Sequence, residues 1–165
     1  MKKIFTMMAA LMISGAVSAQ KLNEKDVPKP VTEAFAKKYP GIKNAKWEKE
    51  DNDFEVAFEV KGSKATASFD AKGGFKESEQ GMKVTELPKV VSDYCTKNYA
   101  GYKISEAAKI TDSKGKVTIE AELSKGKEHF DAIFDEKGNL VKKSDVIKDK
   151  EDEEKGEKDE KGEKD

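Results

Sequence analysis

The chain has no arginine, one histidine and one cysteine among its 165 residues. Without arginine it lacks the side chain best suited to bidentate binding of phosphate or carboxylate. A single cysteine excludes an intramolecular disulfide and a cysteine-based zinc site, and a single histidine excludes zinc sites built from several histidines. The 32 lysines balance 33 acidic residues, and a net charge of −1 argues against nucleic-acid binding. Because no set of nucleophile, base and metal ligands can be assembled, we expect no enzyme activity, no cofactor and no metal site.

The first residues of the chain have the pattern of a secretory signal peptide. Lys2 and Lys3 precede an uncharged, mostly apolar run from 4 to 17, and small residues follow up to Ala19. This pattern predicts a signal peptide over 1–19 that is cleaved after Ala19. The run is short for a membrane-spanning helix, and no later stretch approaches about 18 apolar residues. We therefore expect a periplasmic or secreted protein with no integral membrane segment after cleavage.

The opposite end of the chain is a run of charges. Residues 148–165 contain no apolar side chain and carry six lysines and ten acidic residues. Such a segment has no apolar surface to bury against the entropic cost of ordering, which predicts a disordered, solvated tail. Calcium binding is the alternative, because carboxylates are calcium ligands, although the spacing matches no EF-hand loop and lysines are interspersed.

The part between these ends contains two copies of one pattern. The sequence VPKPV at 27–31 recurs as LPKVV at 87–91, and FDAKG at 69–73 recurs as FDEKG at 134–138. The offset grows from 60 to 65 between these matches, as it would if connecting loops had lengthened. A period of this length is too long for a solenoid unit. We therefore predict two repeats of one small unit, over 20–82 and 83–147.

Hydrophobic periodicity gives the same elements in both repeats. Apolar residues four apart over 27–39 and 87–99 predict a helix in each, and Pro40-Gly41 ends the first one. Alternating apolar residues then predict strands near 44–49, 54–60, 65–69 and from 75, and again near 104–110, 116–123, 128–134 and 139–144. The predicted fold class is α+β: two tandem helix-plus-four-strand antiparallel repeats that form one helix-on-sheet layer over a shared core.

Three short motifs occur in a characteristic order: a helix ending in Tyr39-Pro40-Gly41, a strand with Trp47 followed by charged residues, and the Phe-Asp-x-Lys-Gly turn. This order resembles the PepSY-like family of secreted bacterial proteins, also described as beta-lactamase-inhibitor-like. The resemblance covers about 27–147 and implies a curved sheet and export in a Gram-negative bacterium. It also implies an exported peptidase or other hydrolase as partner. Because this chain lacks the disulfides of the beta-lactamase inhibitor, no inhibitory residue is carried over.

The apolar faces of the predicted elements give a list of structural core residues. Cys95 occupies the helix position of Phe35 in the first repeat, which predicts an inert buried thiol, with a reactive or intermolecular thiol as the alternative. Trp47 is assigned to the core, with an exposed binding anchor as the alternative. The predicted core residues are Phe35, Trp47, Phe58, Phe69, Cys95, Ile119 and Phe134.

The candidate partner-binding residues are Asp51, Asn52 and Asp53, in a carboxylate-rich loop between two predicted strands. An ordinary polar turn is the alternative interpretation of this loop. The sheet face opposite the helices should be open to water, and the alternation of residues makes it rich in lysine and glutamate.

Two functions follow from this organisation. The first is an exported, non-enzymatic module that binds or inhibits an extracytoplasmic hydrolase or peptidase through its sheet face and hairpin loops. The second is a structural or envelope-stress protein that binds ions or surface components weakly through charge. The first predicts an exposed apolar patch on the open sheet face, and the second predicts a uniformly charged one.

Overall fold

The computed structural model describes residues 20–148, so the predicted signal peptide and the segment 149–165 of the predicted tail lie outside it. Ten antiparallel strands form one sheet in the order β1-β2-β3-β4-β5-β6-β7-β8-β10, and β9 also pairs with β8. The strands are β1 (Gln20–Leu22), β2 (Lys46–Glu50), β3 (Asp53–Val60), β4 (Ser63–Asp70), β5 (Phe75–Met82), β6 (Lys103–Asp112), β7 (Val117–Lys125), β8 (Glu128–Asp135), β9 (Leu140–Lys143) and β10 (Ile147–Lys148).

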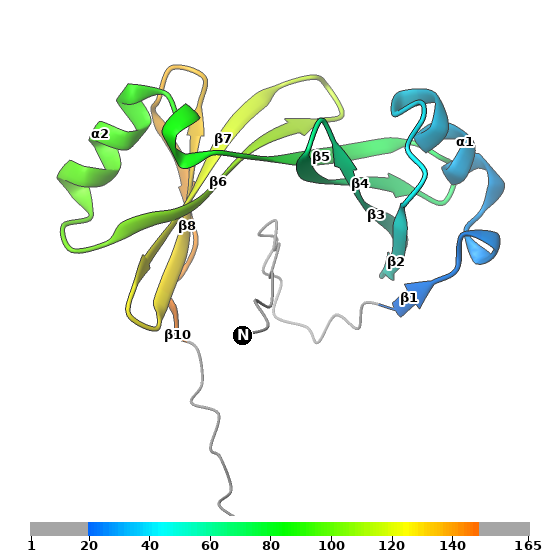
Figure 1. The fold of residues 1–165 in the computed structure, drawn as a ribbon, viewed down its shortest axis with the longest axis horizontal. Coiled ribbons are helices and arrows are strands. Elements are labelled where there is room, and N and C mark those ends of the chain that lie inside the picture. Colours follow the sequence, from blue (N-terminus) through cyan, green and yellow to red (C-terminus); the bar gives the residue numbers. More distant parts are fainter. Residues whose placement is uncertain (1–19, 149–165) are drawn as a thin grey trace, which may run out of the picture.

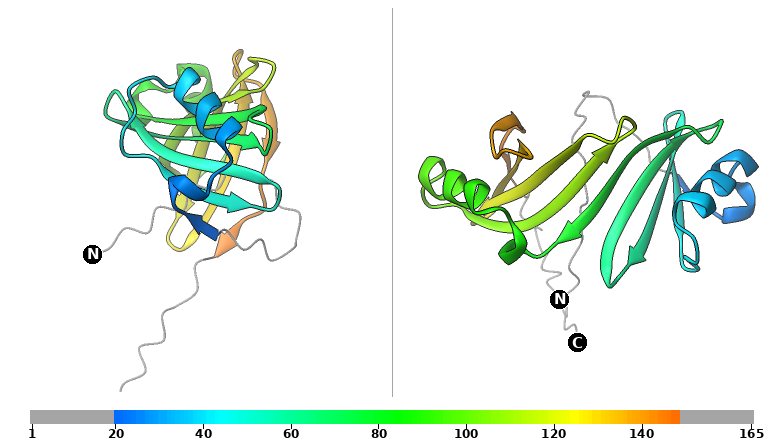
Figure 2. Two further views of the ribbon diagram at one scale, coloured as in Figure 1. Left: turned by 90° about the vertical axis from the view of Figure 1, so that its right-hand side faces the viewer. Right: turned by 90° about the horizontal axis from the view of Figure 1, so that it is seen from above.

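The two helices are α1 (Lys29–Lys38) and α2 (Lys89–Asn98), each preceded by a short 3-10 helix, η1 (Glu24–Asp26) and η2 (Val84–Glu86). Each begins directly after a proline whose φ, near −54°, suits a helix start. The sheet curves, and the helices lie near its opposite ends (Figures 1 and 2).

The predicted α+β fold of two helix-plus-four-strand repeats is confirmed. The eight strands expected from the alternation are β2 to β9. The sequence did not indicate β1 and β10, which add one strand at each side of the sheet by pairing with β2 and β8. These strands are three and two residues long, too short to show any alternation. Only their pairing with a longer neighbour defines them.

On the helix-bearing side of the sheet, the buried apolar side chains form two clusters, where we expected a single shared core. One lies beneath α1 and includes Phe35, Trp47 and Phe69, and the other lies beneath α2 and includes Cys95 and Phe134. The strands that join the two halves explain the separation. On the helix-bearing side, the pairs in the middle of β5 and β6 are polar, Ser78 with Thr111 and Gln80 with Lys109, whereas Met82 with Ala107 is an apolar pair that packs in the second cluster. The sheet is therefore continuous, whereas its core is divided.

The repeated Phe-Asp-x-Lys-Gly motif forms a tight turn that the aspartate closes. The Oδ1 atom of Asp70 accepts hydrogen bonds from the backbone N–H groups of Lys72 and Gly74, at 2.9 and 2.8 Å. Asp135 repeats this geometry in the second copy. The backbone hydrogen bonds lower the pKa of Asp70 below the usual range of a carboxyl group. The pKa of Asp135 is lowered chiefly by the side-chain amide of Asn139, which donates to Oδ2 at 2.9 Å, and further by the backbone hydrogen bonds. The motif therefore has a structural role between strands.

We expect Gly73→Ala to be clearly more destabilising than Gly62→Ala. Both glycines have positive φ, +81° and +77°, so both substitutions strain the backbone. A Cβ at Gly73 would also collide with the backbone carbonyl of Pro30 at the start of α1, whereas Gly62 has nothing within 4 Å. The collision should cost about 1–3 kcal/mol beyond the strain. Urea unfolding of both variants tests this, and equal losses would show that the turn can move away from α1.

Candidate functional site

The face of the sheet that is turned away from both helices, here called the open face, carries most of the acidic side chains of the strands. Strand register places on it Glu48, Glu55, Glu77, Glu79, Glu106, Asp112, Glu120, Glu122 and Asp131. The same register places Lys46, Lys64, Lys103 and Lys142 on this face, and puts Lys49, Lys109, Lys125 and Lys143 on the helix-bearing side. The strand lysines are thus divided between the two faces, and on the open face the acidic side chains outnumber them.

The acids of the open face are direct neighbours across the strands. One row contains, in order from β2 to β6, Glu48, Glu55, Ser68, Glu77 and Asp112. A second row, across β6, β7 and β8, contains Glu106, Glu122 and Asp131. Like charges placed opposite each other destabilise a sheet. These acidic rows should therefore lower the stability of the sheet.

A depression of about 890 Å³ lies on this face, and we call it the acidic hollow. Its lining includes Glu79, Gly81, Ala108, Glu120 and Asp131. Gly81 faces Ala108 across β5 and β6, and Ala108 faces Glu120 across β6 and β7. The residues next to Glu120 on this face therefore have small side chains, which leave a depression in the surface of the sheet.

Glu79 and Glu120 are the buried charged side chains of the part of the chain that the structure describes, at 6% and 8% exposure. The Oε2 atom of Glu120 is fully enclosed and has no hydrogen-bond partner among residues 20–148. A buried polar atom without a partner is costly, so such a group calls for an explanation.

Burial raises the pKa of Glu120 to about 8 and the pKa of Glu79 to about 7. Negative neighbours add to this effect, since Glu79 and Asp131 act on Glu120 while Glu77 and Glu55 act on Glu79. The pKa of Glu55 is likewise raised to about 7, again chiefly by burial. Desolvation and like charges both disfavour the ionised form. Glu79 and Glu120 therefore keep their protons to a higher pH than an ordinary glutamate does.

The predicted partner-binding residues lie elsewhere on the sheet. Asp51 and Asn52 form the exposed turn between β2 and β3, where Asp51 has a φ of +52°, and Asp53 is the first residue of β3. None of the three lines the acidic hollow. Sequence reasoning missed Glu79 and Glu120 because they occupy ordinary polar positions of alternating strands. The one available signal was acids on alternate positions, Glu77 and Glu79 in β5 and Glu120 and Glu122 in β7.

The seven predicted core residues are all buried, each at most 9% exposed. Trp47 packs edge-on against Phe35, with ring centroids 5.4 Å apart, and its 3% exposure places it inside the first cluster. Cys95 is 2% exposed, and burial raises the pKa of its thiol. A raised pKa leaves less of the reactive thiolate at neutral pH.

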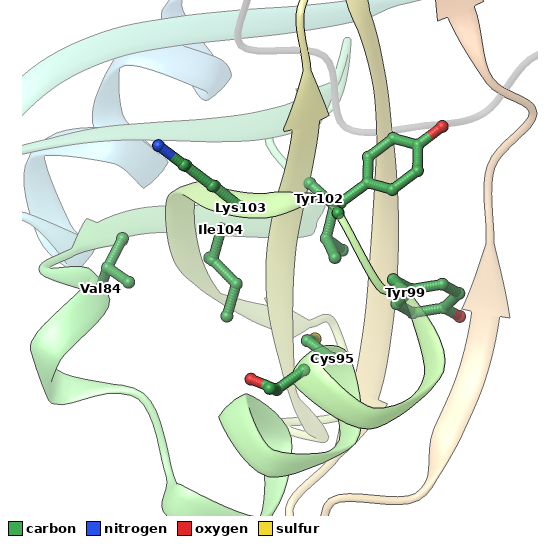
Figure 3. A pocket seen from close by; sticks show the side chains of 9 residues that line it. Val84, Cys95, Tyr99, Tyr102, Lys103 and Ile104 are labelled. Atoms are coloured by element: carbon green, nitrogen blue, oxygen red, sulfur yellow. The ribbon is translucent and has the colours of Figure 1, made fainter.

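A second, smaller depression of about 330 Å³ lies between α2 and the beginning of β6 (Figure 3). Its walls are mainly apolar and aromatic, including Val84, Cys95, Tyr99, Tyr102 and Ile104. Cys95 belongs to the core cluster beneath α2, and Tyr99, Tyr102 and Ile104 pack against that cluster. The depression is therefore an outer edge of the packed core, without converging charged groups.

Two absences complete the description of residues 20–148. Their acidic, histidine and cysteine side chains include no group of three or more that could hold a metal ion. In the same range, no helix has the length and apolar character needed to cross a membrane.

These features define a class of protein: a two-repeat helix-on-sheet protein with an open sheet face. The chain belongs to the family described as "Putative beta-lactamase-inhibitor-like, PepSY-like", which matches residues 16–64 and 56–142. The resemblance drawn from the three sequence motifs is thereby confirmed. Comparison with curated proteins found no match.

Solved structures of Bacteroides proteins share the fold. A DUF2874 family protein from Bacteroides uniformis has a TM-score of 0.66 and 16% identity, over 71% of this chain and 88% of that one. A BLIP-like protein from Bacteroides fragilis has a TM-score of 0.64 and 19% identity, over 76% and 90%. A protein from Bacteroides eggerthii described as a "putative periplasmic" protein has a TM-score of 0.66 and 14% identity, over 72% and 88%. At these identities the likeness concerns the fold.

Proposed function

We propose that this protein is an exported, non-enzymatic binding module that acts in the periplasm or outside the cell. Its open face, with the acidic hollow at its centre, binds an exported protein, and the family name suggests a hydrolase or peptidase as that protein. The turn formed by Asp51, Asn52 and Asp53 would contact the partner beside the sheet. The signal-peptide pattern over 1–19 and the periplasmic description of a structural neighbour support the location.

One observation carries this proposal: the sheet face gathers costly like charges and buries two carboxylates in a hollow, one of them with an oxygen that no described residue contacts. Features that reduce stability tend to persist where they serve binding. The exposed apolar patch that we expected of a binding module is not found on β3 to β7, so the interface proposed here is instead a polar one. The exposed large apolar side chains of the described part, Val84, Val90, Val141 and Val146, lie on separate elements and form no single patch on β3 to β7.

The acidity of the open face also favours a second candidate, a structural or envelope-stress protein that binds ions or surface components weakly through charge. Such binding would be unspecific and would weaken steeply with salt. Specific partner binding, in contrast, should show a fixed stoichiometry and survive physiological ionic strength.

Partner capture separates these functions. Tagged mature chain (20–165) is incubated with periplasmic and secreted extract of the native host at physiological salt. We expect one protein to be retained in a fixed ratio, and its activity can then be assayed with and without the module. Glu122→Lys on the open face should abolish capture, and Lys109→Glu on the helix-bearing side should not. Retention of only salt-labile mixtures would favour the second candidate.

A further inference from the structure

We propose that the acidic hollow receives a lysine or arginine side chain from a basic segment of the partner, whose cationic group lies between Glu79 and Glu120. This inference rests on the proposed function of protein binding and specifies the chemistry of the segment that is bound. It concerns residues that neither the sequence motifs nor the comparisons single out.

The strand register brings the two carboxylates to one place. Glu79 of β5 pairs with Ile110 of β6, and Glu120 of β7 pairs with Ala108 of the same strand. The two acids therefore flank β6 on the open face, one cross-strand row apart. The charge of Glu79 adds to the effect of burial in raising the pKa of Glu120. A cation placed between them would interact with both.

The floor of the hollow beside Glu120 leaves space for a long side chain, whereas the buried Ile110 lies beside Glu79. Gly81 and Ala108, which face each other across β5 and β6, carry the least bulk in this part of the sheet. A Cβ added at Gly81 would meet only the carbonyl oxygen of Lys64, at 3.4 Å. The backbone at Gly81 would therefore tolerate a larger side chain. The small residues found there leave the hollow open beside Glu120.

The chemistry of the hollow calls for a hydrogen-bond donor with a positive charge. The enclosed Oε2 atom of Glu120 has no partner within the described part of the chain. Burial raises the pKa values of Glu79 and Glu120, and the charges of neighbouring carboxylates raise them further. An ammonium or guanidinium group carries several donors and would supply both the hydrogen bond and the compensating charge.

A basic protein segment suits this site better than a metal ion or the chain's own end. The acids of residues 20–148 form no group arranged to hold a metal. The acidic row of β6 to β8 lines the hollow, and the row of β2 to β6 continues the acidic surface across further strands. Such a surface suits a segment with several basic residues. The segment 149–165 has more acids than lysines, so its net charge has the wrong sign.

Bound protons make this interaction depend on pH. At pH 6 Glu79 and Glu120 hold protons, and at pH 8.5 they are largely ionised, while lysine and arginine remain charged at both values. Binding should therefore strengthen with rising pH and release protons below pH 8. The other titratable side chains at the hollow are Glu77, Glu106, Asp112, Glu122 and Asp131 on the strands, together with Lys64, Lys83, Lys127, Glu128 and His129 at its margins.

The test measures binding of a fluorescein-labelled peptide of alternating lysine, arginine and serine to the mature chain (20–165) at 150 mM salt. We expect the Kd of the double variant Glu79→Gln/Glu120→Gln to rise at least about tenfold, a change of about 1.4 kcal/mol. Gly81→Val, which fills the hollow and keeps every carboxylate, should weaken binding similarly. The control Glu33→Gln removes one exposed acid of α1 and should leave the Kd unchanged.

The pH arm uses the same peptide at pH 6 and pH 8.5. Wild-type protein should bind at least about tenfold more tightly at pH 8.5. This preference should disappear in Glu79→Gln/Glu120→Gln and persist in His129→Gln, which separates the two carboxyls from the histidine. Equal binding by wild type and the double variant at both pH values would overturn the inference.

The remaining outcomes separate this inference from the proposed function. If the wild-type protein does not bind the peptide, the basic-segment inference is overturned. If the double variant still captures the partner from extract, the proposed binding function is retained. Loss of capture from extract by wild type itself would instead overturn the proposed function. Displacement of the peptide by calcium chloride, but not by sodium chloride of equal ionic strength, would also overturn the inference and assign the hollow to a metal ion.

Discussion

Glu120→Gln should stabilise the protein at pH 8.5 and change its stability little at pH 5. The pKa of Glu120 is raised by burial to about 8, whereas an unfolded glutamate titrates near 4.5. Between these values the folded state binds one more proton than the unfolded state, so the free energy of unfolding falls as pH rises. Each unit of pKa difference corresponds to about 1.36 kcal/mol. The neutral amide of glutamine avoids the cost of ionising a buried carboxyl group. It should therefore raise the free energy of unfolding at pH 8.5 by on the order of 3–5 kcal/mol.

Urea unfolding of wild type and variant at both pH values measures this effect. Glu33→Gln provides a matched control, because Glu33 is exposed on α1 and forms only a surface ion pair with Lys29 at 3.5 Å. The control should show no difference between the two pH values. Stabilisation of equal size at pH 5 and pH 8.5 would contradict the raised pKa and would point to altered packing.

Truncating either of two phenylalanines should cost about 3–5 kcal/mol of unfolding free energy. Phe69 is 1% exposed in the cluster beneath α1, where its ring contacts Phe35 and Phe75. Phe134 is fully buried in the cluster beneath α2, with its ring centroid 5.3 Å from that of Tyr94. Phe69→Ala and Phe134→Ala each leave a cavity in a packed core, and both lose the buried apolar area of a ring.

The division of the core adds a second expectation for the same positions. Because the two phenylalanines lie in different clusters and share no neighbour, the losses should add within about 0.5 kcal/mol. The milder substitutions Phe69→Leu and Phe134→Leu, alone and together, test this by urea unfolding without exhausting the stability of the chain. A larger coupling energy would show that the polar pairs of β5 and β6 transmit packing between the halves.

Several parts of the fold could be read from the sequence because they depend on local periodicity. Apolar residues four apart defined the buried faces of α1 and α2, and alternation defined β2 to β9. The repeated Phe-Asp-x-Lys-Gly turn works through hydrogen bonds within four residues, which makes it a local feature. The family resemblance rested on these same short elements, and it held for that reason.

The acidic hollow could not be read in this way. The alternation assigned Glu79 and Glu120 to the side of the sheet away from the helices, but it could not show that this side is curved. Glu79 lies between Thr66 and Ile110, and Glu120 lies between Ala108 and Ile133. Both carboxylates are buried, although each occupies a polar position of an alternating strand. The loop at Asp51 to Asp53 stood out in the sequence only because its acids are adjacent along the chain.

The sequence by itself thus determined the elements, the two repeats and the general composition of the surface, because these follow from the spacing of residues along one chain. Tertiary structure alone decided which residues become neighbours across strands. It divided the core at the polar pairs of β5 and β6, and it aligned acids from six strands into rows. Burial of a charge depends on the three-dimensional surroundings of its carboxyl group, and those surroundings exist only once distant strands have paired.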